Sequence, residues 1–130
     1  MESLKKPSVL SSKVSPSAAN RFHAFDLLAT LVAVVRTDGV VVFANAALEV
    51  ALGMSRRTIE GSQLPDCFTE PHILQHALEG AGSNEFAALR YDAWLKRMSH
   101  EPLSVHVVVA QTDTPGEAII ELLPLEQQLF

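Results

Sequence analysis

The sequence of 130 residues predicts one α+β domain: a five-stranded antiparallel sheet with short helices on one face and an N-terminal amphipathic helix. Three observations predict this class. An Asp-Gly pair at positions 38 and 39 separates two β-branched runs, which is typical of a β-hairpin. Short stretches with helix-capping signals follow. The last third of the chain then alternates apolar and polar residues in runs that turn residues separate, as half-buried antiparallel strands do.

The hairpin is the most informative part of the sequence. Residues Leu31 to Val35 are expected to pair with Val40 to Phe43. The residues between them include Asp38 and Gly39, which both tolerate a positive φ. We therefore expect a tight turn in which both of these residues adopt a positive φ.

Asn45 follows the second strand directly and begins a predicted helix. Its side-chain oxygen suits the N-cap position, and the helix is expected to continue through Val50 or Leu52 until Gly53 closes it. Helix capping is the favoured role of Asn45. Contact with a ligand in a cleft between helices and sheet is the second interpretation.

Two more helices are predicted before the third strand. Ser55 caps a short one that ends at Gly61. A longer helix begins at Pro71, because proline at the first helical position loses no hydrogen bond, and it is expected to stop at Gly80 and Gly82. Its buried stripe consists of the apolar residues Ile73, Leu74, Ala77 and Leu78.

Three strands complete the expected sheet. They cover Phe86 to Lys96, Pro102 to Gln111 and Glu117 to Leu125, with turns over Met98 to Glu101 and Thr112 to Gly116. In the first of these strands, alternation places Leu89, Tyr91 and Leu95 on the core face. The other face carries Arg90, Asp92 and Trp94, and a large aromatic residue on such a face is more often an interface anchor.

The N-terminal 19 residues hold six serines, two prolines and three lysines without a hydrophobic period, which predicts a flexible tail. From Asn20, a candidate cap, apolar residues recur at the helical spacing of an amphipathic helix: Phe22, Phe25, Leu28 and Ala29. Phe22, Phe25 and Trp94 are expected to form either a lid within the domain or a homodimer interface.

The hairpin and its capped helix resemble the opening of a PAS sensor domain. The likeness lies in the segments Val40-Val41-Val42-Phe43-Ala44-Asn45-Ala46-Ala47 and Leu52-Gly53-Met54-Ser55, the second of which continues to Glu60-Gly61. It covers about residues 24 to 125. This resemblance implies the PAS fold and a regulatory sensor domain over residues 20–125.

Within that family the chain looks most like the sensor domain of NtrB-type nitrogen-regulation histidine kinases. It shares a helix-poor middle, the Leu64-Pro65-Asp66 step after Gly61, and an ending from Glu121 to Gln128. The likeness implies a homodimeric kinase that acts on a response regulator under a PII-class signal protein, and it implies no tightly bound cofactor. Residues 126–130 would then begin a connector to the kinase core.

Charge and composition exclude other classes. The net charge of −5, without a run of basic residues, argues against nucleic acid as a partner. The single cysteine, Cys67, cannot form an internal disulfide, and no start segment resembles a secretory signal, so a cytoplasmic location is expected. The longest apolar runs are far shorter than a membrane span.

Two histidines are the strongest candidates for a metal site. His72 and His76 stand four residues apart on the predicted long helix, a spacing at which two imidazoles share a metal, and Glu79 is the helical carboxylate nearest to them. A closed metal site needs four ligands, so an exposed pair of histidines is the favoured interpretation. Haem held by a histidine is the alternative that the PAS likeness leaves open.

Flavin photochemistry and an independent enzymatic activity are disfavoured. The segment around Cys67 lacks the Asn-Cys-Arg-Phe-Leu-Gln pattern of the flavin-binding light sensors, so we expect Cys67 to be a small buried apolar residue. No Gly-x-Ser-x-Gly elbow or glycine-rich phosphate loop is present.

Two functions remain: a regulatory module that works without a cofactor, and a PAS pocket that holds a small metabolite, haem or flavin. Large aliphatic residues filling the cleft would favour the first. The residues whose burial in the cleft would distinguish the two functions are Leu89, Val105, Val107, Ile120 and Leu122.

Overall fold

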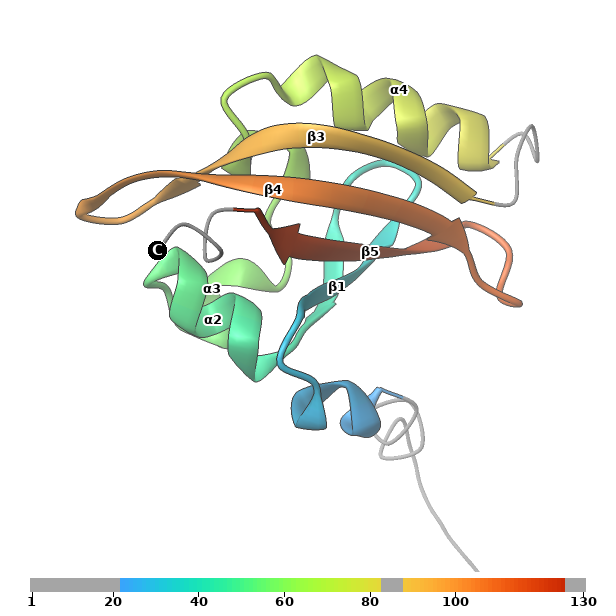
Figure 1. Ribbon diagram of the computed structural model, residues 1–130. Coiled ribbons are helices and arrows are strands. Elements are labelled where there is room, and N and C mark those ends of the chain that lie inside the picture. The colour runs from blue at the N-terminus through green and yellow to red at the C-terminus, as the bar shows by residue number, and fades with distance from the viewer. Residues whose placement is uncertain (1–21, 83–87, 126–130) are drawn as a thin grey trace, which may run out of the picture.

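The sheet has five antiparallel strands in the order β2-β1-β5-β4-β3 (Figure 1). The computed structural model describes residues 22–82 and 88–125. Its strands are β1 (Leu31–Arg36), β2 (Val41–Ala44), β3 (Ala88–Arg97), β4 (His100–Gln111) and β5 (Glu117–Pro124). Its helices are η2 (His23–Leu27), α2 (Ala46–Leu52), α3 (Arg56–Ile59), η3 (Leu64–Cys67) and α4 (Pro71–Gly82). The predicted α+β class is confirmed.

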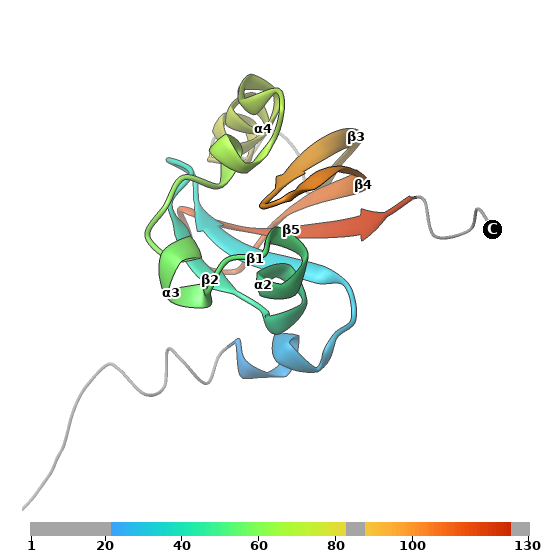
Figure 2. The ribbon, with the colours of Figure 1, turned by 90° about the vertical axis from the view of Figure 1, so that its left-hand side faces the viewer.

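The sheet buries side chains on both faces. Ala33 and Val35 of β1 belong to the main core, where the sheet packs against α2, α3, η3 and α4. Val34 points the opposite way and packs with Phe22 and Phe43 under η2. The helix-rich layer and the N-terminal element therefore pack on opposite faces of the sheet. In Figure 2, α3 and α4 lie to the left of β3, β4 and β5, and the blue N-terminal element lies below α2.

The hairpin between β1 and β2 forms as predicted, and its loop consists of three residues. The amide of Gly39 donates to the carbonyl of Arg36 at 2.8 Å, and the amide of Arg36 donates to the carbonyl of Val40 at 2.9 Å. This pattern encloses a three-residue loop, in which Gly39 has φ +95° and Asp38 has a negative φ. The expectation that both residues adopt a positive φ is wrong, because a glycine bulge places the left-handed residue at the loop's last position.

The capping signals predict the helix ends well. Asn45 caps α2 and Gly53 ends it in the left-handed region with φ +72°, while Ser55 caps α3. The long helix α4 begins at Pro71 as expected but runs through Gly80 to Gly82, because its buried face continues to Ala81. The short helix η3 was not predicted from the sequence. Among the described residues no helix has the length and apolar character to cross a bilayer.

The N-terminal helix differs from the prediction. It is a 3₁₀-helix of five residues, in which Phe25 is half-buried; the buried Phe22 is the residue before it, at the N-cap position. Leu28 and Ala29 are exposed because the chain turns to an extended conformation at Leu28, with φ −89° and ψ 143°, to enter β1. Asn20, the predicted tail and the predicted connector at 126–130 lie outside the described residues.

The β3–β4 hairpin is tighter than predicted. Arg97 pairs with His100, so the loop has only two residues, and Ser99 has φ +61°. The predicted faces of β3 hold for Leu95, which is buried, and for Trp94, which is exposed. Leu89 is the exception, since 37% of it is exposed near the start of the strand. Residues 86 and 87 lie outside the described part of the chain.

We expect Gly39→Ala to lower the free energy of unfolding by about 2 kcal/mol, and Gly116→Ala by about 1 kcal/mol. Both glycines have a positive φ, which strains any residue with a Cβ. At Gly39 an added Cβ would also collide with Oε1 of Gln63 and lie 3.3 Å from Cδ of Pro65, whereas at Gly116 it meets nothing within 4 Å. Urea unfolding measures both values. Equal losses would show that Gln63 moves aside and that Pro65 does not crowd position 39.

Candidate functional site

Asn45 joins three segments through a fully buried carboxamide. Its Oδ1 accepts hydrogen bonds from the amides of Val32 and Leu48, both at 3.0 Å. Its Nδ2 donates to the carbonyls of Phe25 and Thr30, both at 2.9 Å. The side chain thus ties η2 and the segment after it to β1 and to the first turn of α2.

The hydrogen-bonding capacity of this side chain is used within the protein. An amide oxygen has two lone pairs and an amide nitrogen has two protons, and all four are occupied at Asn45. Its exposed fraction is 0%. The capping role predicted from the sequence is therefore accompanied by three bonds that the sequence did not indicate.

An ion pair close to Asn45 was not predicted from the sequence. Arg56, the first residue of α3, forms an ion pair with Asp26 of η2, with 2.8 Å between Nη2 and Oδ1. The two residues are 30 positions apart. No periodicity or motif links positions so distant, so only the folded chain identifies this pair.

The space between the helices and the sheet is filled by large apolar side chains. Four of the five residues that decide between the two functions are buried there: Val105, Val107, Ile120 and Leu122. Leu89 does not contribute, because it is partly exposed. From the helical side the space is filled by Leu48, Leu52, Phe68, Leu74 and Leu78.

Tyr91 carries an unusual polar atom on the core face of β3. Within the described part of the chain, its hydroxyl is the buried side-chain polar atom without a hydrogen-bond partner. Burial raises the pKa of Tyr91 to about 12, because the charged phenolate would lose its hydration. An unsatisfied buried hydroxyl costs about 1–3 kcal/mol. It is the polar group that an acceptor on a ligand entering this core could satisfy.

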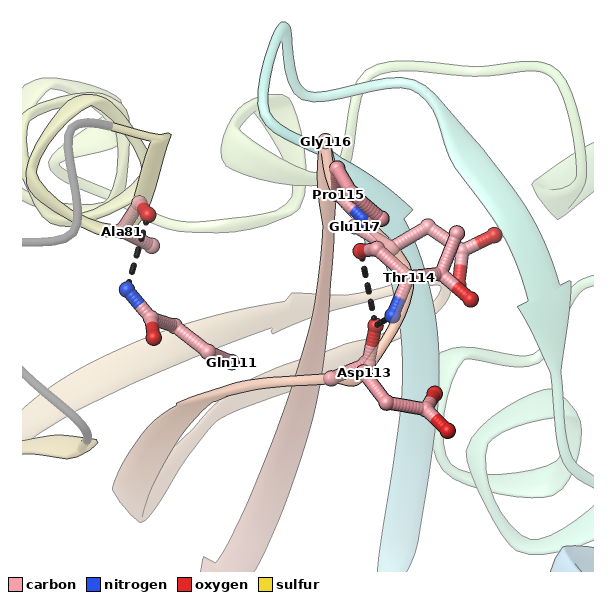
Figure 3. Close-up of a pocket in the computed structure, with 8 residues that line it drawn as sticks. Ala81, Gln111, Asp113, Thr114, Pro115, Gly116 and Glu117 are labelled. Carbon is pink, nitrogen blue, oxygen red and sulfur yellow. Dashed lines mark hydrogen bonds between the residues drawn. The ribbon is translucent and has the colours of Figure 1, made fainter.

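A polar pocket of about 180 Å³ lies between the end of α4 and the β4–β5 loop (Figure 3). Its polar groups bond one another: Gln111 donates to the carbonyl of Ala81 at 2.9 Å, and the Thr112 hydroxyl donates to the carbonyl of Thr114 at 3.0 Å. The carboxylate of Asp113 points away from Gln111 (Figure 3). The pocket is smaller than typical ligand sites, which measure about 300–1,000 Å³.

A second pocket, of about 270 Å³, lies where the end of α2 meets η3 and the tip of the β3–β4 hairpin. Its apolar lining comes from Leu52, Met54, Cys67 and Met98, and its charged lining from Asp66, Lys96 and Arg97. Cys67 is half-buried, and burial raises the pKa of its thiol, so the thiol stays protonated and weakly nucleophilic at neutral pH.

The histidines of α4 lie on its exposed face. His76 has an exposed side chain, and its Nδ1 is 3.9 Å from Oε1 of Glu79. His72 is exposed as well. In residues 22–82 and 88–125 no three histidine, cysteine or acidic side chains converge as metal ligands would.

The three aromatic residues expected to act together lie on one face of the sheet but toward its opposite edges. The rings of Phe22 and Phe25 pack with that of Phe43, with 5.4 Å between the centroids of Phe22 and Phe43, over β2 and β1. Trp94 lies on β3, at the opposite edge of the sheet, and is 50% exposed. Phe22 and Phe25 therefore form a lid within the domain, whereas Trp94 remains an exposed residue.

We expect Asn45→Ala to lower the free energy of unfolding by about 3–4 kcal/mol, because it removes four hydrogen bonds, to the amides of Val32 and Leu48 and to the carbonyls of Phe25 and Thr30. The carbonyl of Phe25 keeps its bond from the amide of Leu28. Ser55→Ala, which removes an exposed N-cap, should cost about 1 kcal/mol. Urea unfolding of both variants gives the comparison. A loss at Asn45 no larger than that at Ser55 would show that the buried bonds contribute little.

The raised pKa of Tyr91 predicts a loss of stability at high pH. Tyr91 is the sole tyrosine, so ultraviolet titration reports it alone. The folded chain should form tyrosinate near pH 12, whereas the unfolded chain does so near the ordinary value of 10.0. The unfolded state therefore loses this proton first, and the stability present below pH 10 is lost as the pH rises toward 12. Tyr91→Phe should lack this part of the decline; an identical pH profile would refute the assignment.

The comparisons with known proteins agree with this fold. Residues 19–123 match the PAS fold family. The PAS domain of an HTR-like protein from Haloarcula marismortui superimposes with a TM-score of 0.69 at 14% identity, over 86% of this chain and 94% of that chain. A domain of the sensory box sensor histidine kinase/response regulator from Geobacter sulfurreducens gives 0.68 at 14% identity, over 82% and 93%.

A third similar structure holds a small molecule. It is the PAS domain of the Cronobacter turicensis RpfR quorum-sensing receptor in complex with BDSF, with a TM-score of 0.65 at 12% identity, over 75% of this chain and 95% of that chain. A search of curated protein sequences gives no significant match. At such identities these structures share the fold, and the family match covers most of the sequence. The chain belongs to the PAS fold family.

Proposed function

We propose that this chain is the regulatory sensor domain of a two-component signalling protein, with a histidine kinase core as its partner in the same polypeptide. Membership of the PAS fold family supports a sensor role. The fold shared with a domain of the Geobacter sulfurreducens sensor histidine kinase/response regulator supports the kinase context. In this proposal the domain itself catalyses no reaction and acts in the cytoplasm.

The filled core is the observation that carries the proposal of a domain without a tightly bound cofactor. Val107, Ile120 and Leu122 from the sheet meet Leu74 and Leu78 from α4, and all five are at most 1% exposed. A haem or flavin would have to displace several of these side chains, and each leucine-sized displacement costs on the order of 2–5 kcal/mol. The domain then works through protein contacts and internal coupling.

Nitrogen regulation is the finer form of this proposal. The Leu64-Pro65-Asp66 step and the sequence after Glu121 support an NtrB-type kinase. The step forms η3, which buries Leu64 and Pro65 beneath the helical layer. In this form a PII-class signal protein and a nitrogen response regulator are the partners of the full-length protein.

We further propose that the domain forms a homodimer through the face of the sheet that η2 leaves uncovered. Trp94 is 50% exposed on that face. Its cross-strand neighbour is Ser104, and Val108 and Leu123 lie half-buried on the same side of β4 and β5. The Asp92–His106 pair lies between Trp94 and Val108 on this face. An exposed tryptophan on the same face as half-buried aliphatic residues is a common feature of an interface. Phe22 and Phe25 then border this surface as part of the lid.

A PAS module that binds a small molecule is the second candidate function. The buried hydroxyl of Tyr91 favours it, since a ligand with a hydrogen-bond acceptor would satisfy that group. The RpfR domain in complex with BDSF shows that a PAS fold at this level of similarity takes a small molecule.

Native mass spectrometry of the purified chain tests both proposals in one measurement. We expect the mass of a homodimer with no added small molecule, and a monomer for Trp94→Asp. Val50→Asp is the matched control, because Val50 is an apolar residue of α2 that is 81% exposed and lies away from the sheet face; it should remain dimeric. A co-purifying molecule would favour the second function, and a monomeric wild-type chain would refute the dimer.

A further inference from the structure

The ion pair between Asp26 and Arg56 joins the two layers that cover opposite faces of the sheet. Asp26 belongs to η2, on the outer face, and Arg56 begins α3, on the face of the main core. The link has two arms, from Nη2 to Oδ1 at 2.8 Å and from Nη1 to Oδ2 at 3.2 Å. Asp26 Oδ1 also accepts a hydrogen bond from the amide of Ala46, the first residue of α2, at 2.9 Å.

The arginine is held in position from two further sides. Its backbone amide donates to Oε2 of Glu49 on α2 at 2.9 Å. Its guanidinium carbon lies 5.4 Å from the ring centroid of Phe43, within the range of a cation–π contact. Phe43 belongs to β2, which is an edge strand, and its ring also contacts Phe22 and Phe25. The arginine therefore reaches around the edge of the sheet to the lid on its other face.

Partial burial distinguishes this pair from an ordinary surface ion pair. The side chains of Arg56 and Asp26 are 33% and 23% exposed, whereas those of Arg36 and Asp38, which form the other arginine–aspartate pair of the described residues, are 58% and 51% exposed. Exposed pairs contribute little to stability because water and salt screen them. An ion pair that forms two hydrogen bonds and is partly shielded from water fixes the relative orientation of its side chains more strongly than an exposed pair does.

We infer that the Asp26–Arg56 pair is a latch that couples the position of α3 to the N-terminal 3₁₀-helix. A displacement of α3 moves Arg56 and weakens its bonds to Asp26, so that η2 is held less tightly. The Asn45 bond to the Phe25 carbonyl, the Ala46 bond to Asp26 and the aromatic packing then remain to hold it. The bonds of Asn45 hold α2 and β1 in place while this happens, because they do not involve α3. This inference rests on the proposed sensor role, for which it supplies a route from the helical layer to the N-terminal segment.

Hydrogen exchange of the full chain tests the latch. The amides of Phe25 and Leu28 report on η2, since both are hydrogen-bonded within that region. We expect Arg56→Met and Asp26→Asn each to raise their exchange rates about tenfold, with Arg56→Lys in between. Arg36→Gln, in the exposed pair, should leave both rates within about twofold. Rates unchanged in both Arg56→Met and Asp26→Asn would overturn the latch, and Arg56→Lys provides the same test if a variant fails to fold.

A test of coupling between α3 and η2 needs a second substitution, placed in the cap of α3. Ser55→Ala removes the side-chain cap of α3 without touching η2. In the wild-type background it should raise the exchange of Phe25 and Leu28, and in the Arg56→Met background it should add nothing further. Equal effects in both backgrounds would overturn the inference. Dimer mass and bound ligands do not enter this readout, so a failure of the proposed function is recognised separately.

Discussion

The buried carboxamide of Asn45 is the interaction on which the rest of this domain depends. A polar group at zero exposure is tolerated only when its hydrogen bonds are complete. Here the four partners come from η2, from the segment before β1, from β1 and from α2. These segments must therefore meet at one point, and the start of the helical layer is fixed relative to the first strand.

The sheet works as a two-faced scaffold around this point. One face supports the helices over a core of buried apolar side chains, and the other is divided between an aromatic lid over β1 and β2 and a more open area around Trp94. The lid and the open area lie at opposite edges because β2 and β3 are the outer strands. The open area is therefore a surface whose exposed side chains the core does not need.

The filled core and the Asp26–Arg56 pair favour a domain that transmits displacements between its elements over one that binds a ligand in its core. Close-packed side chains transmit a displacement because they cannot absorb it. The hydroxyl of Tyr91 is the one buried side-chain polar atom of the described core that lacks a hydrogen-bond partner. A ligand-binding domain would place a hydrogen-bond acceptor next to this hydroxyl, whereas a domain that works without a ligand leaves it without a partner.

The sequence by itself determined the features whose hydrogen bonds close within a few residues: the hairpin at Gly39, the caps at Asn45 and Ser55, and the start of α4 at Pro71. It also determined the sheet, because alternation records which side chains face the core. Only the tertiary structure decided the 3₁₀ form of η2, the second set of Asn45 bonds, the Asp26–Arg56 pair and the separation of Trp94 from Phe22 and Phe25. These depend on groups 13 to 30 or more positions apart, which local patterns do not connect, and on the strand order that brings them together or keeps them apart.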